Sequence, residues 1–223
     1  MMVFRDRQAA GRQLGVRLSH LGIDKPVLLA IPRGGIPVAA AVAGELQIGF
    51  SILPLRRLVI PWRLENDYGY VTSSGELHLN QALVGQLRLT PQEIYRTADT
   101  EKARLLLDLD RWGAPHQVKV DGQKALIIDD GMHSGWAMYS AVEMVRKLGA
   151  GKIIAAVPVS HFRAQRFLQH HCDEVVCLIV ENIPLFRLEN YYEHFSPVTD
   201  EDIRSLTPSM GQSSFESATS SRV

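Results

Sequence analysis

Two adjacent acids followed by a short glycine-bounded loop are the residues of this chain best suited to chemistry. Asp129 and Asp130 come directly after the apolar run 125–128, and Gly131 and Gly135 bound the loop that follows. Unpaired backbone amides at the start of a helix carry a partial positive charge and bind phosphate. Carboxylates accept hydrogen bonds from vicinal hydroxyls, and Mg²⁺ can bridge their charges to phosphate. The stretch therefore predicts a sugar-phosphate site.

A buried strand and an amphipathic helix are the elements that must position these acids. The run 125–128 predicts the strand, and the helix is indicated by apolar residues recurring every three or four positions over 138–148. Carboxyl ends of parallel strands border the crevice in which open α/β sheets bind ligands. Since strand neighbours point in opposite directions, one acid can face this crevice while the other anchors the loop. An acidic loop at a strand end, with no ligand, is the alternative.

A second strand–loop–helix unit surrounds Arg33. The apolar run 26–31 predicts a buried strand, and a helix of small residues is predicted over 37–46. Gly34 and Gly35 would let the backbone approach a ligand closely, and Arg33 offers two parallel donors to phosphate oxygens. A tight turn with a solvated arginine is the alternative.

Most of the remaining chain alternates between strand and helix patterns. Segment 56–79 instead reads as a β-rich excursion with a hairpin near Ser74 and Gly75. The other predicted strands are 50–55, 152–159 and 174–180, and the other predicted helices are 6–21, 90–111 and 162–171. The helix that starts at Thr90 carries mixed charge, and a solvated face is expected for it. This order predicts an α/β fold with a mainly parallel sheet and helices on both faces.

At this point the sequence resembles a known family. Residues 125–137 resemble the phosphoribosyl pyrophosphate (PRPP) motif of type I phosphoribosyltransferases: four apolar residues, two acids and a small phosphate-binding loop. The wider chain, from about Val3 to Leu206, resembles a little-studied group of that family. The supporting segments are Phe4–Arg7 with Gly11 and Arg12, Ile31–Ala39, Arg56–Leu58, Leu79–Asn80, Phe195–Ser196 and Thr199–Asp200.

The resemblance implies a type I phosphoribosyltransferase-like fold in a single domain. Residues 1–206 would form this domain, and the β-rich excursion at about 56–80 would be the hood that recognises the acceptor. Trp62, Tyr68 and Tyr70 could stack on a flat base there, or fill a small satellite core. The Ser-rich residues 207–223 are expected to be a flexible tail.

The resemblance also implies a reaction, in which a nitrogen atom of a nucleobase or related acceptor displaces pyrophosphate from the ribose of PRPP. Asp129 and Asp130 would hold the ribose hydroxyls and Mg²⁺, directly or through ribose and water. The expected PRPP and phosphate ligands are Arg33, Gly34, Gly35, Gly131, Met132, His133, Ser134 and Gly135. His133 could transfer a proton or order the loop. Arg56 and Arg57 could contact pyrophosphate or form a solvated edge.

Three departures from the family pattern bear on this reading. Trp136 is bulkier than the residue usual there and could narrow the loop mouth or pack beneath it. Ala137 replaces a threonine, and segment 59–67 has lost the Gly-rich character of the group. A non-catalytic protein that binds PRPP or a nucleotide and regulates a partner is therefore the alternative function.

Composition narrows the possible partners and location. The chain has 223 residues with 24 basic and 24 acidic side chains, so no overall field favours nucleic acid or membranes. Residues 1–17 lack the apolar run of a secretory signal, and Cys172 and Cys177 fit reduced thiols. We expect a cytoplasmic protein that binds PRPP and a small-molecule acceptor, with no nucleic acid or membrane partner. Because family members often dimerise, a homodimer is also possible.

Overall fold

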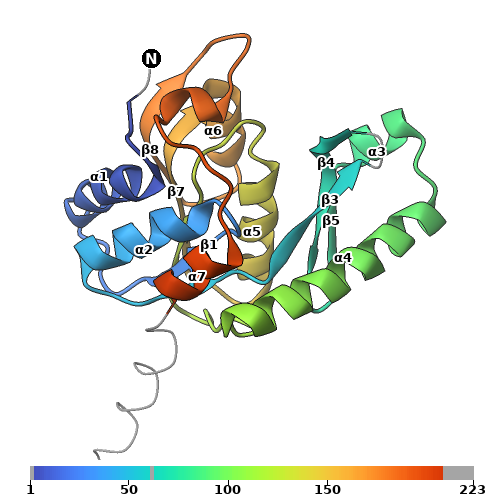
Figure 1. Cartoon of the computed structure of the whole chain (residues 1–223), viewed down its shortest axis with the longest axis horizontal. Helices are drawn as coiled ribbons and strands as arrows, with labels where there is room; N and C mark the ends of the chain where they lie inside the picture. The colour runs from blue at the N-terminus through green and yellow to red at the C-terminus, as the bar shows by residue number, and fades with distance from the viewer. Residues whose placement is uncertain (1–2, 61–62, 208–223) are drawn as a thin grey trace, which may run out of the picture.

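A five-stranded parallel sheet forms the main body of the protein in a computed structural model that describes residues 3–60 and 63–207 (Figure 1). The strand order is β2–β1–β6–β7–β8, and every pair is parallel. The strands are β1 (Val27–Ala30), β2 (Phe50–Ile52), β6 (Lys124–Ile128), β7 (Lys152–His161) and β8 (Glu174–Glu181). The predicted α/β fold with a mainly parallel sheet is confirmed.

Helices cover both faces of this sheet. On β6, Leu126 and Ile128 join one core with α1 (Arg7–Ser19) and α2 (Gly35–Leu46). Ala125 and Ile127 join the other core with α5 (Trp136–Lys147) and α6 (Phe162–Leu168). Strand alternation explains the division, because successive side chains point to opposite faces. Burial on both faces is why the central strands are continuous apolar runs.

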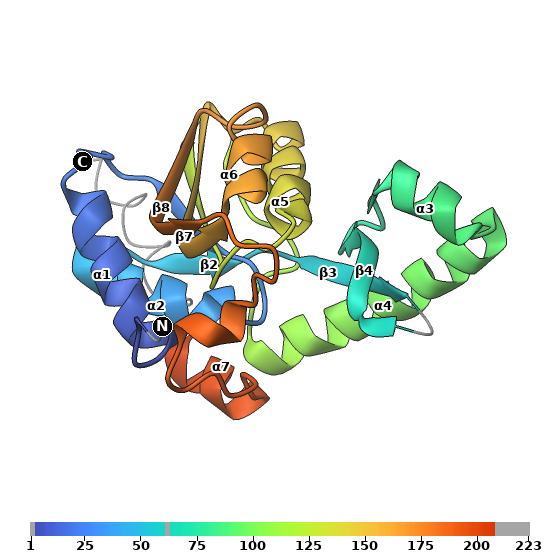
Figure 2. The ribbon, with the colours of Figure 1, turned by 90° about the horizontal axis from the view of Figure 1, so that it is seen from above.

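A second, antiparallel sheet projects from one side of the main body (Figure 2). It contains β3 (Leu55–Ile60), β4 (Arg63–Thr72) and β5 (Leu77–Leu79), in that order. The predicted hairpin joins β4 to β5, where Gly75 has a φ of +93°. Tyr68 is fully buried in the small core of this sheet, whereas Tyr70 packs in the core of the main body. Trp62 lies outside the described residues.

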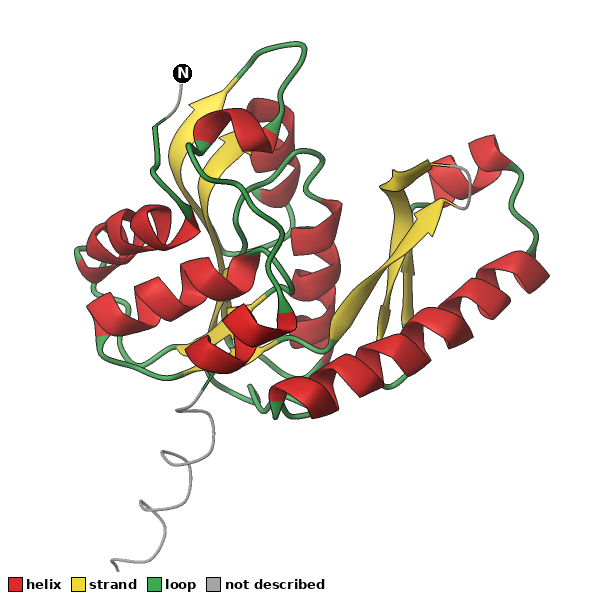
Figure 3. Ribbon diagram, viewed as in Figure 1, coloured by secondary structure: helices red, strands yellow, loops and turns green. Residues whose placement is uncertain are grey.

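Two helices follow the second sheet (Figure 3). Helix α3 (Gln81–Leu87) was not predicted, although Asn80 caps it by accepting a hydrogen bond from the Leu83 amide. Helix α4 (Pro91–Trp112) begins with the predicted cap at Thr90. The prediction of a solvated charged face on α4 is wrong in part, because Glu101 and Asp108 are buried. Both acids pair with Arg56 of β3.

Several other elements differ from the prediction. The predicted strand 50–55 is two strands, β2 and β3, interrupted at Leu53 and Pro54, where proline offers no amide to a ladder. The helix predicted over 162–171 ends at Leu168. The 3₁₀ turn η1 (Leu188–Tyr191) and helix α7 (Asp200–Leu206) were not predicted.

The expected tail, residues 207–223, lies outside the described residues except for Thr207. That residue is buried, and its hydroxyl donates to the Trp112 carbonyl at 3.4 Å. Within residues 3–60 and 63–207, none of the helices has both the length and the apolar character needed to cross a membrane.

Candidate functional site

The two loops singled out in the sequence meet at the carboxyl edge of the parallel sheet. Strands β1 and β6 are neighbours, with Ala30 opposite Ile128. A Cβ atom on Gly34 would lie 2.1 Å from Oδ2 of Asp130, and one on Gly35 would lie 2.6 Å from the Ile128 carbonyl oxygen. Both positions therefore require glycine. These glycines allow β6 and its following loop to lie close to the backbone of residues 34 and 35, whereas the sequence prediction explained them by the approach of a ligand.

The two acids are buried and play different local roles. Oδ1 of Asp129 accepts a hydrogen bond from the Asp130 amide at 2.9 Å, which shapes the start of the loop. Oδ2 of Asp130 accepts from Nε of Arg7 at 2.7 Å. The Asp130 carbonyl accepts from the Tyr192 hydroxyl at 2.5 Å. Asp129 thus anchors the turn, while the side chain of Asp130 is tied to the N-terminal helix.

Burial controls the charge of this pair. Burial first, and then the charge of Asp130, raise the pKa of Asp129 well above its ordinary value, while Arg7 opposes the shift. The side chains of Arg7 and Asp130 are only 12% and 11% exposed, so their attraction is weakly screened by water. Burial raises the pKa of Tyr192 far above its ordinary value, so that its hydroxyl remains a donor.

Several backbone amides of the loop before α5 have no hydrogen-bond partner among the described residues. The amides of Gly131, His133, Ser134 and Gly135 donate to no other described residue. The Met132 amide instead donates to the Val159 carbonyl at 3.0 Å, and the Met132 carbonyl accepts from the His161 amide at 2.8 Å. Met132 therefore fastens the loop to β7, and its amide is not available to a phosphate as the sequence prediction required. The other four amides are candidate donors for an anion, because unpaired amides at a helix start carry a partial positive charge.

Side chains around the loop leave its mouth largely polar. His133 and Ser134 are exposed, and the imidazole of His133 packs edge-on against Phe186 at 5.8 Å between ring centres. The Trp136 indole packs against Tyr139 and Phe167, with centres 5.2 and 5.8 Å away. Of the two arrangements predicted for Trp136, the structure favours packing against the helices.

Arg33 is paired with two acids, although its side chain is 38% exposed. Its Nη1 lies 2.8 Å from Asp200 of α7, and its Nη2 lies 3.4 Å from Asp108 of α4. The guanidinium also lies over the Trp112 ring, 4.9 Å from the centre. These contacts fix the side chain more firmly than the alternative of a tight turn with a solvated arginine implies.

The two arginines of β3 differ in their surroundings. Arg56 contacts Glu101 at 2.5 Å and Asp108 at 2.7 Å. Arg57 is exposed and lies opposite Tyr70 on β4. Arg56 is therefore part of a buried ionic cluster, whereas Arg57 fits the solvated edge.

These loops are those of a known family. A family model described as the phosphoribosyl transferase domain matches residues 8–190. The chain belongs to the phosphoribosyltransferase family. Two proteins from Mycobacterium tuberculosis strains, provisionally named phosphoribosyl transferases, are 31% identical over 208 residues, which cover 91% of this chain and 46% of theirs. The chain thus spans about half the length of these curated relatives.

A solved structure supports the same assignment. The crystal structure of TT1426 from Thermus thermophilus is 32% identical, with a TM-score of 0.75, over 92% of this chain and 98% of that chain. The fold is accordingly that of the phosphoribosyltransferases, and the resemblance inferred from the sequence is confirmed.

Two residues that hold the phosphoribosyltransferase loops in place were absent from the predicted site. Arg7 reaches Asp130 across 123 positions of sequence, and Tyr192 reaches it across 62. Arg7 lies in the Phe4–Arg7 segment that carried part of the resemblance, which was the signal available. Leu188 is a third: a Cβ atom on Gly131 would lie 2.2 Å from its Cδ1 atom, so this side chain packs directly on the loop.

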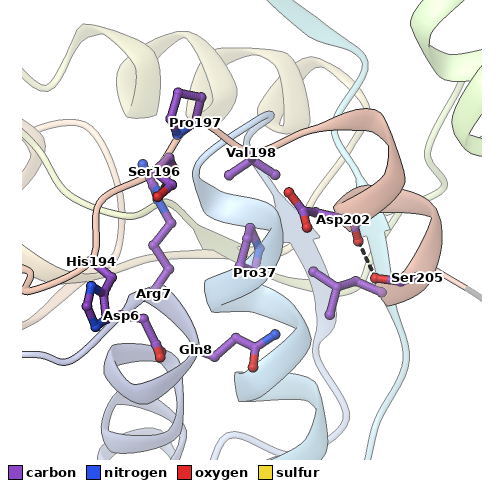
Figure 4. A pocket seen from close by; sticks show the side chains of 11 residues that line it. Asp6, Arg7, Gln8, Pro37, His194, Ser196, Pro197, Val198, Asp202 and Ser205 are labelled. Carbon is purple, nitrogen blue, oxygen red and sulfur yellow. Dashed lines mark hydrogen bonds between the residues drawn. The ribbon is translucent and has the colours of Figure 1, made fainter.

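A separate cavity of about 340 Å³ lies beside Arg7 (Figure 4). It is lined by residues of α1, by Pro37, by the segment from His194 to Val198, and by α7. Arg7 extends across it toward Ser196, whose carbonyl accepts from Nη1 at 2.7 Å. No residue of the loop 129–135 lines this cavity, so it is distinct from the loop at the start of α5.

Asp129 and Asp130 supply only part of the ligands that a Mg²⁺ ion needs. No cluster of three or more His, Cys, Asp or Glu side chains suited to a metal occurs in the described part of the chain. Mg²⁺ is, however, commonly bound through one or two carboxylates together with substrate phosphates and water. Asp129 and Asp130 can serve as those carboxylates, and the remaining oxygen ligands would come from substrate.

Proposed function

We propose that this protein transfers a phosphoribosyl group from PRPP to a nitrogen-containing acceptor, a nucleobase or related compound, and releases pyrophosphate. The observation that carries the proposal is the juxtaposition of four unpaired amides at the start of α5 with two buried carboxylates and the Arg33 loop. These groups match, in order, a terminal phosphate, a ribose and a pyrophosphate. Family membership supports PRPP-dependent transfer in general.

The 5′-phosphate is assigned to the loop at the start of α5. The free amides of Gly131, His133, Ser134 and Gly135, with the Ser134 hydroxyl, donate to its oxygens. Met132 holds the loop against β7 while they do so. The partial positive charge at the N-terminus of a 12-residue helix adds to the attraction.

The ribose hydroxyls are assigned to the two acids. Oδ2 of Asp129 and Oδ1 of Asp130 accept no hydrogen bond from a nitrogen donor of a described residue. The two residues are 9% and 8% exposed, so a ligand hydroxyl can approach their carboxylates. Each carboxylate therefore keeps one oxygen for a hydroxyl.

Pyrophosphate departs as the acceptor attacks. The lone pair of the acceptor nitrogen forms the bond to the anomeric carbon, and the electrons of the breaking carbon–oxygen bond leave with pyrophosphate. Arg33 and the Gly34 backbone stabilise the negative charge that develops on the leaving group, whereas the Gly35 amide already donates to the Ile31 carbonyl at 3.1 Å. Mg²⁺, when bound through Asp129 and Asp130, would supply further charge neutralisation there. Asp129 and Asp130 oppose the positive charge on the ribose ring.

The acceptor loses a proton, and His133 is assigned the role of receiving it. Its imidazole is exposed at the loop and contacts Phe186 rather than another ionisable group. A neutral imidazole has a ring nitrogen that can accept this proton. The second sheet, β3–β4–β5, is assigned the role of the hood over the acceptor. Two free, half-buried thiols support the cytoplasmic location included in the proposal.

Calorimetry with PRPP and Mg²⁺ tests the first half of the proposal. Asp129→Asn is the informative variant, because the amide oxygen can still accept from the Asp130 amide while the charge is lost. We expect it to remove most PRPP affinity without unfolding the chain. Unchanged affinity would remove Asp129 from the site.

A screen of nucleobases for pyrophosphate release tests the second half. Release with one acceptor class would identify the substrate. Binding of PRPP without release from any base would instead assign the non-catalytic role of a PRPP-binding regulator. The engagement of Arg33 by two acids is the observation that favours this second candidate.

A further inference from the structure

Asp200 pairs with Arg33, the side chain to which the proposed function assigns pyrophosphate. The Oδ1 atom of Asp200 lies 2.8 Å from Nη1 of Arg33 and accepts a hydrogen bond from Nε1 of Trp112 at 3.0 Å. The guanidinium lies over the same indole. Aspartate, arginine and indole thus form a closed triangle between α7, the β1–α2 loop and α4. An aspartate here presents to Arg33 the same charged oxygens as a phosphate group.

Distances show which acid holds which arginine. Oδ2 of Asp108 is 2.7 Å from Arg56 but 3.4 Å from Arg33. The shorter contact assigns Asp108 mainly to Arg56. Asp200 is thus the principal counter-ion of Arg33. The hydrogen bond from Trp112, and after it the charge of Arg33, lower the pKa of Asp200 against the opposing effect of burial, which keeps it ionised.

The charged side chains around Arg33 carry more positive than negative charge. Four arginines face three acids: Arg33, Arg56, Arg104 and Arg111 against Glu101, Asp108 and Asp200. The cluster therefore carries one excess positive charge. An entering polyphosphate would neutralise it, whereas Asp200 alone does not.

Helix α7 packs against α2 and α4, and lies beside α2 in Figure 1. It has seven residues, and within it only Ile203 is fully buried. The Val198 carbonyl just before it accepts from Arg33 at 3.2 Å. Helices of this length do not persist without tertiary contacts. The Asp200–Arg33 pair is therefore one of the tertiary contacts that keep α7 in place, beside the packing of Ile203 and Leu206 in the core.

We propose that α7 is an autoinhibitory latch, in which Asp200 occupies Arg33 until a pyrophosphate group displaces it. The identity of the displacing anion rests on the proposed function. The latch makes two linked statements: Asp200 competes with pyrophosphate for Arg33, and α7 loosens when pyrophosphate binds.

The first statement is tested by titrating inorganic pyrophosphate, with Mg²⁺, into the full chain and two variants. Asp200→Asn removes the charge but keeps an oxygen that can accept from Trp112. Glu201→Gln is the matched control, because it removes the same charge from the next, exposed position of α7. We expect Asp200→Asn to bind pyrophosphate about two- to five-fold more tightly, the range of a partly exposed ion pair, and Glu201→Gln to bind like the wild type. Equal or weaker binding by Asp200→Asn would overturn the latch and make Asp200 a positioning residue.

The second statement needs no variant. Hydrogen exchange of the α7 amides, such as the Ile203 amide that donates to the Thr199 carbonyl, should accelerate when pyrophosphate is added to the wild type. Unchanged protection at saturating pyrophosphate would overturn the latch. So would failure of both the wild type and Asp200→Asn to bind pyrophosphate.

Failure of the latch and failure of the proposed function give different results. A wild type that binds PRPP while α7 stays protected refutes the latch alone. A protein that binds pyrophosphate and releases α7, but does not bind PRPP, refutes the proposed function alone.

Discussion

The buried pair between Arg7 and Asp130 supports a quantitative prediction about folding. Either single replacement, Arg7→Met or Asp130→Asn, leaves the partner group poorly exposed and without its counter-ion, since the two side chains are 12% and 11% exposed. Breaking a buried pair in this way costs about 3 kcal/mol or more. For a chain of this size the corresponding fall in Tm is roughly 6–12 °C. Arg7→Met should lose slightly more, because Arg7 also donates to the Ser196 carbonyl and stacks on Phe195.

The assay is a double-mutant cycle measured by thermal and urea unfolding. The double variant Arg7→Met/Asp130→Asn removes both charges together, so we expect it to be little worse than Arg7→Met alone, with a coupling free energy of about 2–3 kcal/mol. The control is Arg5→Gln. Its pair with Asp6 is exposed, at 66% and 28%, and its loss should cost less than about 1 kcal/mol.

Two results would refute this reasoning. If either single variant lost less than about 1 kcal/mol, the pair would be screened by water as a surface pair is. If the single losses simply added in the double variant, the two groups would be stabilised by separate contacts, and Arg7 would not be the residue that holds Asp130 in place.

Three further predictions concern the loops. Gly34→Ala should separate the loops, weaken PRPP binding and cost about 1–3 kcal/mol, since its Cβ would lie 2.1 Å from Asp130; Gly44→Ala, with nothing within 4 Å, should instead stabilise α2 by up to about 1 kcal/mol. The pKa of Asp129 is raised in the folded protein, so the protonated carboxyl favours the folded state; this contribution is complete below the ordinary pKa of 3.8 and is lost as pH rises through the raised pKa. The Tm of the wild type should therefore fall more steeply with rising pH than the Tm of Asp129→Asn. Parallel curves of Tm against pH would contradict this. Trp136→Ala should cost about 1–3 kcal/mol in urea unfolding but leave PRPP affinity within about twofold, because the indole packs on Tyr139 and Phe167; a large gain in affinity would show that it blocks the loop.

Local patterns made the two loops predictable. The apolar run 125–128 followed by acids and then by helical periodicity describes β6, the loop and α5 with boundaries that differ by one or two residues. The run 26–31 with its glycines does the same for β1 and α2. In both cases the chain itself contains the strand, the turn and the helix, so no distant contact is needed to recognise them.

Contacts between distant segments were not predictable from periodicity. Arg7 lies 123 positions from Asp130, and its arginine looks like any other in a charged helix until the sheet brings the two together. The acids of α4, Glu101 and Asp108, were expected to be solvated because their partner, Arg56, lies 45 and 52 positions earlier in the chain. The order of the strands in the sheets decides which distant residues come into contact, and the composition of the chain does not specify that order.

One omission did have a local signal. Thr199 and Asp202 form a capping box, in which each side chain accepts from the backbone amide of the other residue. The spacing of a threonine and an acid three residues later predicts a helix start. Hydrophobic periodicity does not indicate this helix, because Ile203 is its only deeply buried residue among those described.

Helix α4 belongs to both hydrophobic interiors of the molecule. Its first half contributes Ile94 and Ala98 to the interior of the antiparallel sheet, and its last turns contribute Leu105, Leu109 and Trp112 to that of the parallel sheet. A helix of 22 residues is a rod about 33 Å long. A tilt of the antiparallel sheet would therefore move the end of α4 that carries Trp112, over which Arg33 lies. Helix α4 thus connects the region assigned to acceptor recognition with the arginine assigned to the leaving group, although no strand pairs one sheet with the other among the described residues.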